Sequence, residues 1–189
     1  MSKRSEELKM LSTESISQAL FRLLEKQSYE SITVTQIATM AGVSRMAFYR
    51  NYETKDDVIK GFLASSFAGF SHGLQEEMGI SKREAITRYF QFIYGIRAEI
   101  QALIDNQKEN LLYEQISLHL RDTIGTLVET RDSDRIRYFI AAMRGIFYSI
   151  TIEWVSDGCR QRPEEMARIF LEISRVKDGL PGIFEEGIN

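Results

Sequence analysis

The chain has 189 residues, a formal net charge of −3 at pH 7, a single cysteine and two prolines. This length suits one compact unit or two small ones, and the slightly acidic charge argues against indiscriminate coating of nucleic acid. Cys159 alone excludes an intrachain disulfide, and no apolar run is long enough to span a bilayer. The N-terminal segment lacks the apolar core of a signal peptide, so we expect a cytoplasmic protein with no membrane partner.

The first predicted helix runs from about Glu6 to Gln27, where leucine and isoleucine recur at helical spacing. Its broad apolar face suits a brace that packs against the segments following it. The polar residues before it are expected to form a solvated terminus. Lys3 and Arg4 could alternatively reach a DNA minor groove, as the basic arms of some regulators do.

Two short helices joined by a tight turn are predicted between Thr33 and Tyr52. Thr33 is a good N-cap, and Gln36 three residues later completes a capping-box pattern. Gly42 lies where the chain must turn sharply, because glycine tolerates a positive φ. Ser44 then caps the second helix. The pattern predicts a helix-turn-helix whose second helix can enter a DNA major groove, although a helical hairpin that only builds a core shares it.

The segments on either side of the motif favour DNA binding. Residues 8–63 resemble the DNA-binding domain of the TetR/AcrR family of transcriptional regulators. The residues that match the family pattern are Ala19, Leu23, Leu24, Tyr29, Thr33, Val34, Ile37, Ala38, Ala41, Gly42, Val43, Ser44, Phe48, Tyr49, Tyr52, Lys55 and Val58. Ser28, Met46, Ala47 and Asn51 depart from it, which leaves the details of base recognition open.

The resemblance implies that the second helix of the motif contacts DNA bases and that residues in and around the motif contact DNA phosphates. We expect Arg45 to bond a base in the major groove, and guanine is the expected base because arginine matches its O6 and N7 atoms. Phosphate contacts are expected from Thr33, Ser44, Tyr49, Asn51 and Lys55. Secondary candidates for DNA contact are Thr35, Gln36, Met46 and Arg50.

A helix predicted to begin after Thr54 connects the motif to the rest of the chain. Thr54 is its N-cap and Asp57 its N3 residue. Lys55 in the first turn opposes the helix dipole, an arrangement that a bound phosphate would explain. Apolar residues from Val58 to Phe70 continue this helix into the second half of the chain.

Further helices are predicted to begin at about Ser81, Ala98, Leu111, Ile136 and Pro163. The fold is therefore expected to be all-α, with about nine helices in two domains. We predict an N-terminal three-helix DNA-binding domain over residues 1–53, with the helix-turn-helix at 33–52, and a helical effector-binding and dimerisation domain over 54–189.

The helix predicted over 136–155 is apolar nearly all round, so we expect it to be buried on more than one side. Residues 145–170 are similar to the C-terminal region of a TetR subgroup that includes dihydroxyacetone-kinase regulators. The family resemblance implies dimerisation through the last two long helices. The apolar stripe expected at the dimer interface consists of Met166, Ile169, Phe170 and Ile173.

The second domain is rich in aromatic residues, most of which are expected to be ordinary core. Some could line an apolar cavity between helices that binds a small apolar effector. The candidates for this lining are Phe62, Phe67, Phe70, Tyr89, Tyr113, His119, Tyr148 and Trp154.

Catalytic and metal-binding patterns are absent from the sequence. His72 and His119 are not at metal-ligand spacing with each other or with Cys159, and no phosphate loop or catalytic triad can be identified. We predict a non-enzymatic homodimer without cofactor or metal, a repressor that an effector releases from a pseudo-palindromic operator. Two alternatives stay open: control by a protein partner, and a helical interaction module without a DNA role.

Overall fold

The structure is a computed structural model that describes residues 3–75, 80–127 and 133–174. In these ranges every regular element is helical, which confirms the all-α class. The elements are α1 (Lys3–Leu24), the 3-10 turn η1 (Tyr29–Ser31), α2 (Val34–Met40), α3 (Arg45–Asn51), α4 (Lys55–Gln75), α5 (Lys82–Gly95), α6 (Arg97–Asp105), α7 (Asn110–Leu127), α8 (Ser133–Ser156) and α9 (Pro163–Ser174). None of these helices combines the length and apolarity needed to cross a bilayer.

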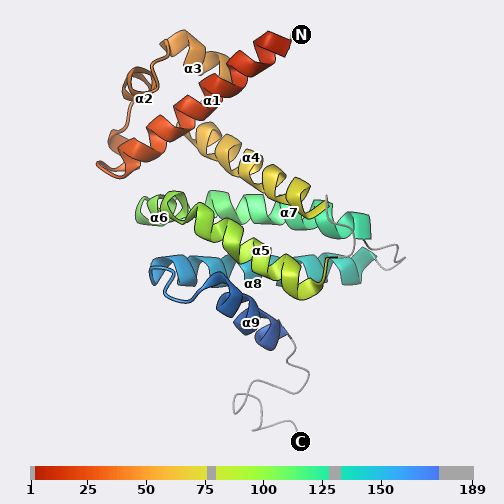
Figure 1. The fold of residues 1–189 in the computed structure, drawn as a ribbon. Helices are drawn as coiled ribbons and strands as arrows, with labels where there is room; N and C mark the ends of the chain where they lie inside the picture. The colour runs from red at the N-terminus through yellow and green to blue at the C-terminus, as the bar shows by residue number, and fades with distance from the viewer. Residues whose placement is uncertain (1–2, 76–79, 128–132, 175–189) are drawn as a thin grey trace, which may run out of the picture.

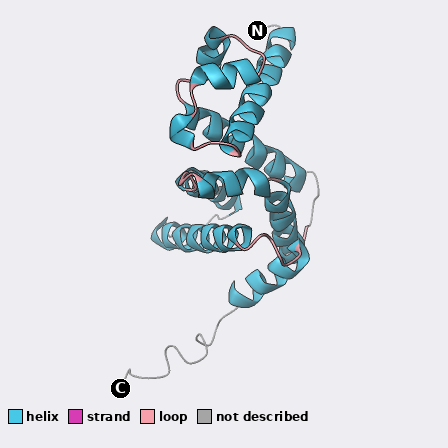
Figure 2. Ribbon diagram, turned by 90° about the vertical axis from the view of Figure 1, so that its left-hand side faces the viewer, coloured by secondary structure: helices cyan, strands magenta, loops and turns pink. Residues whose placement is uncertain are grey.

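The helices form an elongated molecule with α1, α2 and α3 at one end and α9 at the other (Figure 1). α4 packs on α1 near the first end and on α7 further along. α7 in turn packs against α8, and α5 packs against α9. The turned view shows the same succession of tiers from the side (Figure 2). Because α4 packs on both α1 and α7, a movement of α4 relative to α7 also displaces α1.

A continuous cluster of buried apolar side chains extends from α1 at one end of the molecule to α9 at the other. It includes Leu20 of α1, Phe48 of α3, Leu63 of α4, Phe90 of α5 and Phe170 of α9, all nearly inaccessible to solvent. Full burial of each such side chain stabilises the fold by about 1.5–3 kcal/mol. The amphipathic patterns found in the sequence therefore do mark core faces.

α8 packs against both α6 and α7, in agreement with the expected burial on more than one side. Near its start, Tyr138 and Phe139 are 66% and 55% exposed within their own chain. Gly95 ends α5, and an added Cβ there would meet nothing within 4 Å, so close packing does not require glycine at this position. The side chains of Lys3 and Arg4, and residues 175–177 of the last predicted helix, lie outside the described part of the chain.

Candidate nucleic-acid interface

The start of α2 is fixed by two side chains that cap it. The Thr33 hydroxyl oxygen accepts from the Gln36 N–H at 3.2 Å, and the Thr33 N–H donates to Gln36 Oε1 at 2.8 Å. This confirms the predicted capping box. The Thr33 hydroxyl also donates to Gln36 Oε1 at 2.9 Å. The Thr33 proton is therefore already in use, and the Gln36 amide nitrogen is the remaining side-chain donor of this pair for DNA.

The turn into α3 also follows the sequence prediction. Gly42 has a φ of +67°, a backbone conformation that would be strained in a residue with a side chain. Ser44 caps α3, because its Oγ accepts from the Ala47 N–H at 3.0 Å. Within the described residues the Ser44 hydroxyl donates to no acceptor, so its proton is available to a phosphate oxygen.

The buried side of α3 determines which residues face outward. Phe48 is fully buried, so the opposite side of the helix points away from the domain. The exposed residues of α3 are Arg45, Met46, Tyr49 and Arg50. In the described part of the chain neither arginine forms an ion pair, so both positive charges are available to a ligand.

Asn51 does not share this outward face. Its amide nitrogen donates to the Ala47 carbonyl at 2.8 Å and approaches the Ser12 hydroxyl of α1 at 3.5 Å. The side-chain oxygen can only accept a hydrogen bond, so a phosphate contact must use the amide nitrogen. The predicted phosphate contact by Asn51 would therefore compete with the bonds to Ala47 and Ser12. Asn51 instead joins the end of α3 to α1.

The Lys55 ammonium, at the start of α4, is directed into the protein. Nζ donates to the carbonyls of Tyr29 at 2.6 Å and Ile32 at 2.7 Å, and it lies 4.1 Å from the centroid of the Tyr29 ring. Burial lowers the pKa of Lys55, and the charge of Glu30 offsets part of that effect. These contacts explain a lysine in the first turn of α4 without a phosphate. The prediction based on the helix dipole missed them because the two carbonyls are 26 and 23 residues away.

Tyr29 also contacts the turn between α6 and α7. Its N–H donates to Asn106 Oδ1 at 2.8 Å, and Lys108 Nζ lies 4.0 Å from its ring centroid. Its hydroxyl donates to Asp56, whose carboxylate is also 3.3 Å from Lys108 Nζ. Burial, followed by the hydrogen bond to Asp56, raises the pKa of Tyr29. The segment just before the motif is therefore held by side chains of α4 and of the α6–α7 turn.

The predicted effector-binding residues do not form a single group. Four of them meet in an aromatic cluster between α4, α5 and α7, with ring centroids 5.0–6.1 Å apart. This aromatic cluster consists of Phe67, Phe70, Tyr89, His119 and, in addition, Phe92. Because the rings fill the space by touching one another, a ligand seated there would have to separate them.

Tyr89 has a polar partner inside this cluster. Its hydroxyl lies 2.8 Å from Thr151 Oγ1, and both side chains are buried. Burial raises the pKa of Tyr89. A ligand could use the Tyr89 hydroxyl only by replacing Thr151 as its partner.

The other predicted lining residues lie elsewhere. Phe62 packs edge-to-face on Phe21 of α1, with centroids 4.7 Å apart. Tyr113 and Tyr148 form an edge-to-face pair between α7 and α8, with centroids 5.2 Å apart. The eighth residue, Trp154, lies near the end of α8. The structure thus divides the predicted set over the length of the molecule.

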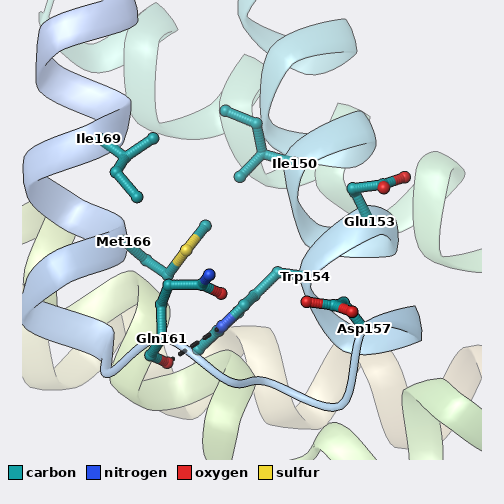
Figure 3. Close-up of a pocket in the computed structure, with 7 residues that line it drawn as sticks. All are labelled: Ile150, Glu153, Trp154, Asp157, Gln161, Met166 and Ile169. Carbon is teal, nitrogen blue, oxygen red and sulfur yellow. Dashed lines mark hydrogen bonds between the residues drawn. The ribbon is translucent and has the colours of Figure 1, made fainter.

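A hollow of about 280 Å³ lies between the end of α8 and the start of α9 (Figure 3). Its lining residues are Ile150, Glu153, Trp154, Asp157, Gln161, Met166 and Ile169. In Figure 3 the side chains of Ile150, Met166 and Ile169 gather on one side, and Trp154 Nε1 donates to the Gln161 carbonyl at 3.2 Å. Sequence reasoning missed this hollow, because its position depends on the path of the loop that connects α8 to α9.

The predicted dimer residues fall into two groups. Met166 and Phe170 are buried in their own protomer, and Phe170, only 2% exposed, lies with its ring centroid 4.6 Å from that of Phe147. These two side chains already pack within their own protomer, which leaves little of their surface for the predicted dimer interface. Ile169 is partly exposed and Ile173 is 47% exposed, so these two remain available to a second chain.

Cys159 lacks the environment of a reactive thiol. Burial raises its pKa, and the charge of Arg97 offsets only part of this effect. A raised pKa reduces the thiolate fraction, which is the form that oxidants attack. Among the described residues no group of histidine, cysteine, aspartate and glutamate could hold a metal ion.

Two family models match this sequence. The model for bacterial regulatory proteins of the tetR family matches residues 16–61, and a model for the C-terminal region of transcriptional regulators matches residues 82–175. The chain belongs to the TetR family of transcriptional regulators. The first match contains the capped helices α2 and α3 and the start of α4, and the second extends from α5 through α9.

Solved structures share this TetR fold at low sequence identity. Lin0861 from Listeria innocua has a TM-score of 0.75 and 19% identity, with 93% of each chain covered. The dihydroxyacetone kinase operon activator DhaS has a TM-score of 0.59 and 16% identity, covering 87% of this chain and 94% of its own. Thermus thermophilus FadR, a TetR-family repressor solved in complex with lauroyl-CoA, has a TM-score of 0.55 and 17% identity, covering 89% of this chain and 97% of its own. A search of curated proteins finds no match.

Proposed function

We propose that this TetR-family regulator binds a pseudo-palindromic operator as a homodimer, with α3 of each protomer in a major groove. The outward face of α3 is the observation that supports this most directly. A buried Phe48 and the Ser44 cap hold the helix. Two arginines lie exposed on it, with no ion pair to any other residue that the structure describes. No acidic residue occurs between Glu30 and Glu53 to repel a phosphate backbone.

The proposed contacts divide into base and phosphate contacts. Arg45, in the first turn of α3, is the proposed base contact, with guanine as its partner. Ser44 and Tyr49 are the proposed phosphate contacts, and Thr35, Gln36 and Arg50 are secondary ones. Thr33 and Lys55 are weaker candidates because each has intramolecular partners. We propose a DNA-binding domain at residues 1–53 and an effector-binding and dimerisation domain at residues 54–189.

The decisive experiment begins by selecting duplexes from a randomised DNA pool with the purified protein. Arg45→Ala should then cost about 1–3 kcal/mol on the selected duplex and relax the preference at one base pair of each half-site. Arg22→Ala, which removes an exposed arginine at the far end of α1, is the matched control and should leave affinity unchanged. Failure to select any sequence would refute the proposed function, and equal losses on selected and random DNA would refute the role of Arg45.

The homodimer is proposed to form through the outer faces of α8 and α9. Tyr138, Phe139 and Ile173 are large apolar side chains that their own protomer leaves exposed there. Ile169 and the hollow beside it continue the same side of α9. A second copy would remove these side chains from water, and dimerisation would set the distance between the two copies of α3.

Release by a small apolar effector and action as a repressor are the finer parts of the proposal. FadR, which has the same fold, binds lauroyl-CoA and is a repressor, whereas DhaS is named as an activator. The aromatic cluster around Phe67 and Phe70 offers an acyl chain an apolar environment. A promoter reporter with the selected operator tests the direction of control, and a protein partner becomes the better explanation if no small molecule changes operator binding.

A further inference from the structure

Met46 is the most exposed large apolar side chain among the described residues, with 81% of its surface accessible. Packing therefore explains nothing about the choice of methionine at this position, since the side chain makes little contact with its own protein. Lysine, arginine or glutamate would suit an exposed helical position equally well. A single exposed apolar residue is common on protein surfaces, so exposure alone does not assign a role. The position of Met46 on α3 supplies the second observation.

Met46 lies in the first turn of α3, directly after Arg45 and close to Tyr49 on the same exposed side. Phe48 fixes the rotation of the helix, because its fully buried ring must face the domain core. The first turn of a recognition helix is the part that reaches base edges in the major groove. The proposed function therefore brings the Met46 side chain to the bases as soon as α3 enters the groove.

We infer that Met46 determines specificity by packing against the C5-methyl group of a thymine in each half-site. In the major groove thymine alone presents an apolar group, whereas the edges of the other bases present hydrogen-bond donors and acceptors. A thioether is only a weak acceptor and cannot satisfy those polar groups. Any other base opposite Met46 would lose water without gaining a hydrogen bond, so thymine is favoured. This inference rests on the proposed operator binding.

The size of the preference follows from the area of one methyl group. Burying a methyl group against an apolar side chain changes affinity by about fourfold for each half-site. Methionine suits this contact because its unbranched side chain adapts to the position of the methyl group. Arg45 would then supply a polar contact and Met46 an apolar contact from adjacent positions of the same turn.

The test replaces thymine by uracil, which removes the C5-methyl group and leaves every hydrogen-bonding atom in place. In the duplex selected by the wild-type protein, each thymine of the half-site is replaced in turn, symmetrically in both halves. At one position the replacement should weaken the affinity of the wild-type protein for the duplex by about fourfold per half-site, or roughly 15-fold for the dimer. Met46→Ala should bind the thymine and uracil duplexes equally. Met40→Ala, which alters an exposed methionine of α2, is the control and should keep the wild-type ratio.

The outcomes separate this inference from the proposed function. If the protein selects no sequence, operator binding itself is refuted. If it selects a sequence but uracil has no effect at any position, or if Met46→Ala keeps the uracil effect, operator binding stands and the role of Met46 is overturned. Met46→Gln keeps the length of the side chain but adds polar atoms, so it should also bind the thymine and uracil duplexes with equal affinity. Because Met46 is exposed, thermal unfolding of both variants should match the wild type.

Discussion

Lys55→Met separates two roles for the ammonium at the start of α4. Methionine keeps most of the side chain but removes the charge, together with the bonds to the carbonyls of Tyr29 and Ile32 at 2.6 and 2.7 Å. Hydrogen bonds from a charged group contribute about 1.5–3 kcal/mol each. Because Lys55 is only partly buried, we take the lower value for both bonds, or about 3 kcal/mol. For a chain of this length that loss lowers Tm by roughly 6–12 °C.

The assay compares thermal unfolding and DNA binding in the same set of variants. Lys60→Met is the matched control on the same helix, because its ammonium makes an exposed ion pair with Glu114 at 3.9 Å. Such a pair contributes about 0–1 kcal/mol. Equal Tm values for the two variants, combined with a salt dependence of DNA binding that falls by about one unit for Lys55→Met alone, would refute the structural role. That result would restore the phosphate contact expected from the sequence.

Three further predictions concern the dimer, the core and the cap of α4. Ile173→Asp should give a folded monomer in sedimentation velocity. Phe170→Asp should instead lose helical circular dichroism, because Phe170 is buried in its own protomer. A stable Ile173→Asp dimer would show that the interface lies elsewhere. Tyr89→Phe should lower the free energy of unfolding in urea by about 1–2 kcal/mol, and Tyr89→Phe combined with Thr151→Val should lose less than the sum of the single changes. Hydrogen bonds from the Thr54 hydroxyl and N–H lower the pKa of Asp57 from its usual 3.8. The stability from this cap is therefore present above pH 3.8 and is lost as pH falls through the lower folded-state pKa. The free energies of unfolding in urea of wild type and Asp57→Asn should differ at neutral pH and converge in acid.

Local features of the fold could be predicted from the sequence because they depend on neighbouring residues. The capping box of Thr33 and Gln36, the Ser44 cap and the positive φ of Gly42 each involve positions at most three residues apart. These features place α3 and its exposed residues, so the central part of the candidate site was accessible before the structure.

Long-range contacts could not be predicted, and they changed the roles of particular residues. The family resemblance made Lys55 and Asn51 candidate phosphate ligands, but each donates within the protein. Met166 and Phe170 share an apolar stripe with Ile169 and Ile173, and periodicity cannot say whether α5 or a second chain covers that stripe. The buried pair and the exposed pair became distinguishable only when α9 was placed against α5.

The arrangement of α4 also predicts how an effector would act on DNA binding. α4 carries Phe62, which packs on Phe21 of α1, and Phe67, which packs on His119 of α7 with centroids 5.3 Å apart. A ligand that separates the rings beside Phe67 must therefore move α4, and with it α1 and α3. Two copies of α3 must match half-sites about 34–36 Å apart, so a small rotation weakens operator binding more than binding to random DNA.

Thermodynamic linkage makes this prediction measurable from the side of the ligand. If an acyl ligand lowers operator affinity by some factor, the operator must lower the affinity for that ligand by the same factor. Lauroyl-CoA is a suitable probe, titrated into the protein alone, with the selected operator and with random duplex. Phe67→Ala should weaken binding of the probe if it enters the aromatic cluster, whereas Phe139→Ala on the outer face of α8 should not. Equal probe affinities with and without operator, for a probe that Phe67→Ala weakens, would show that α4 does not couple the two sites.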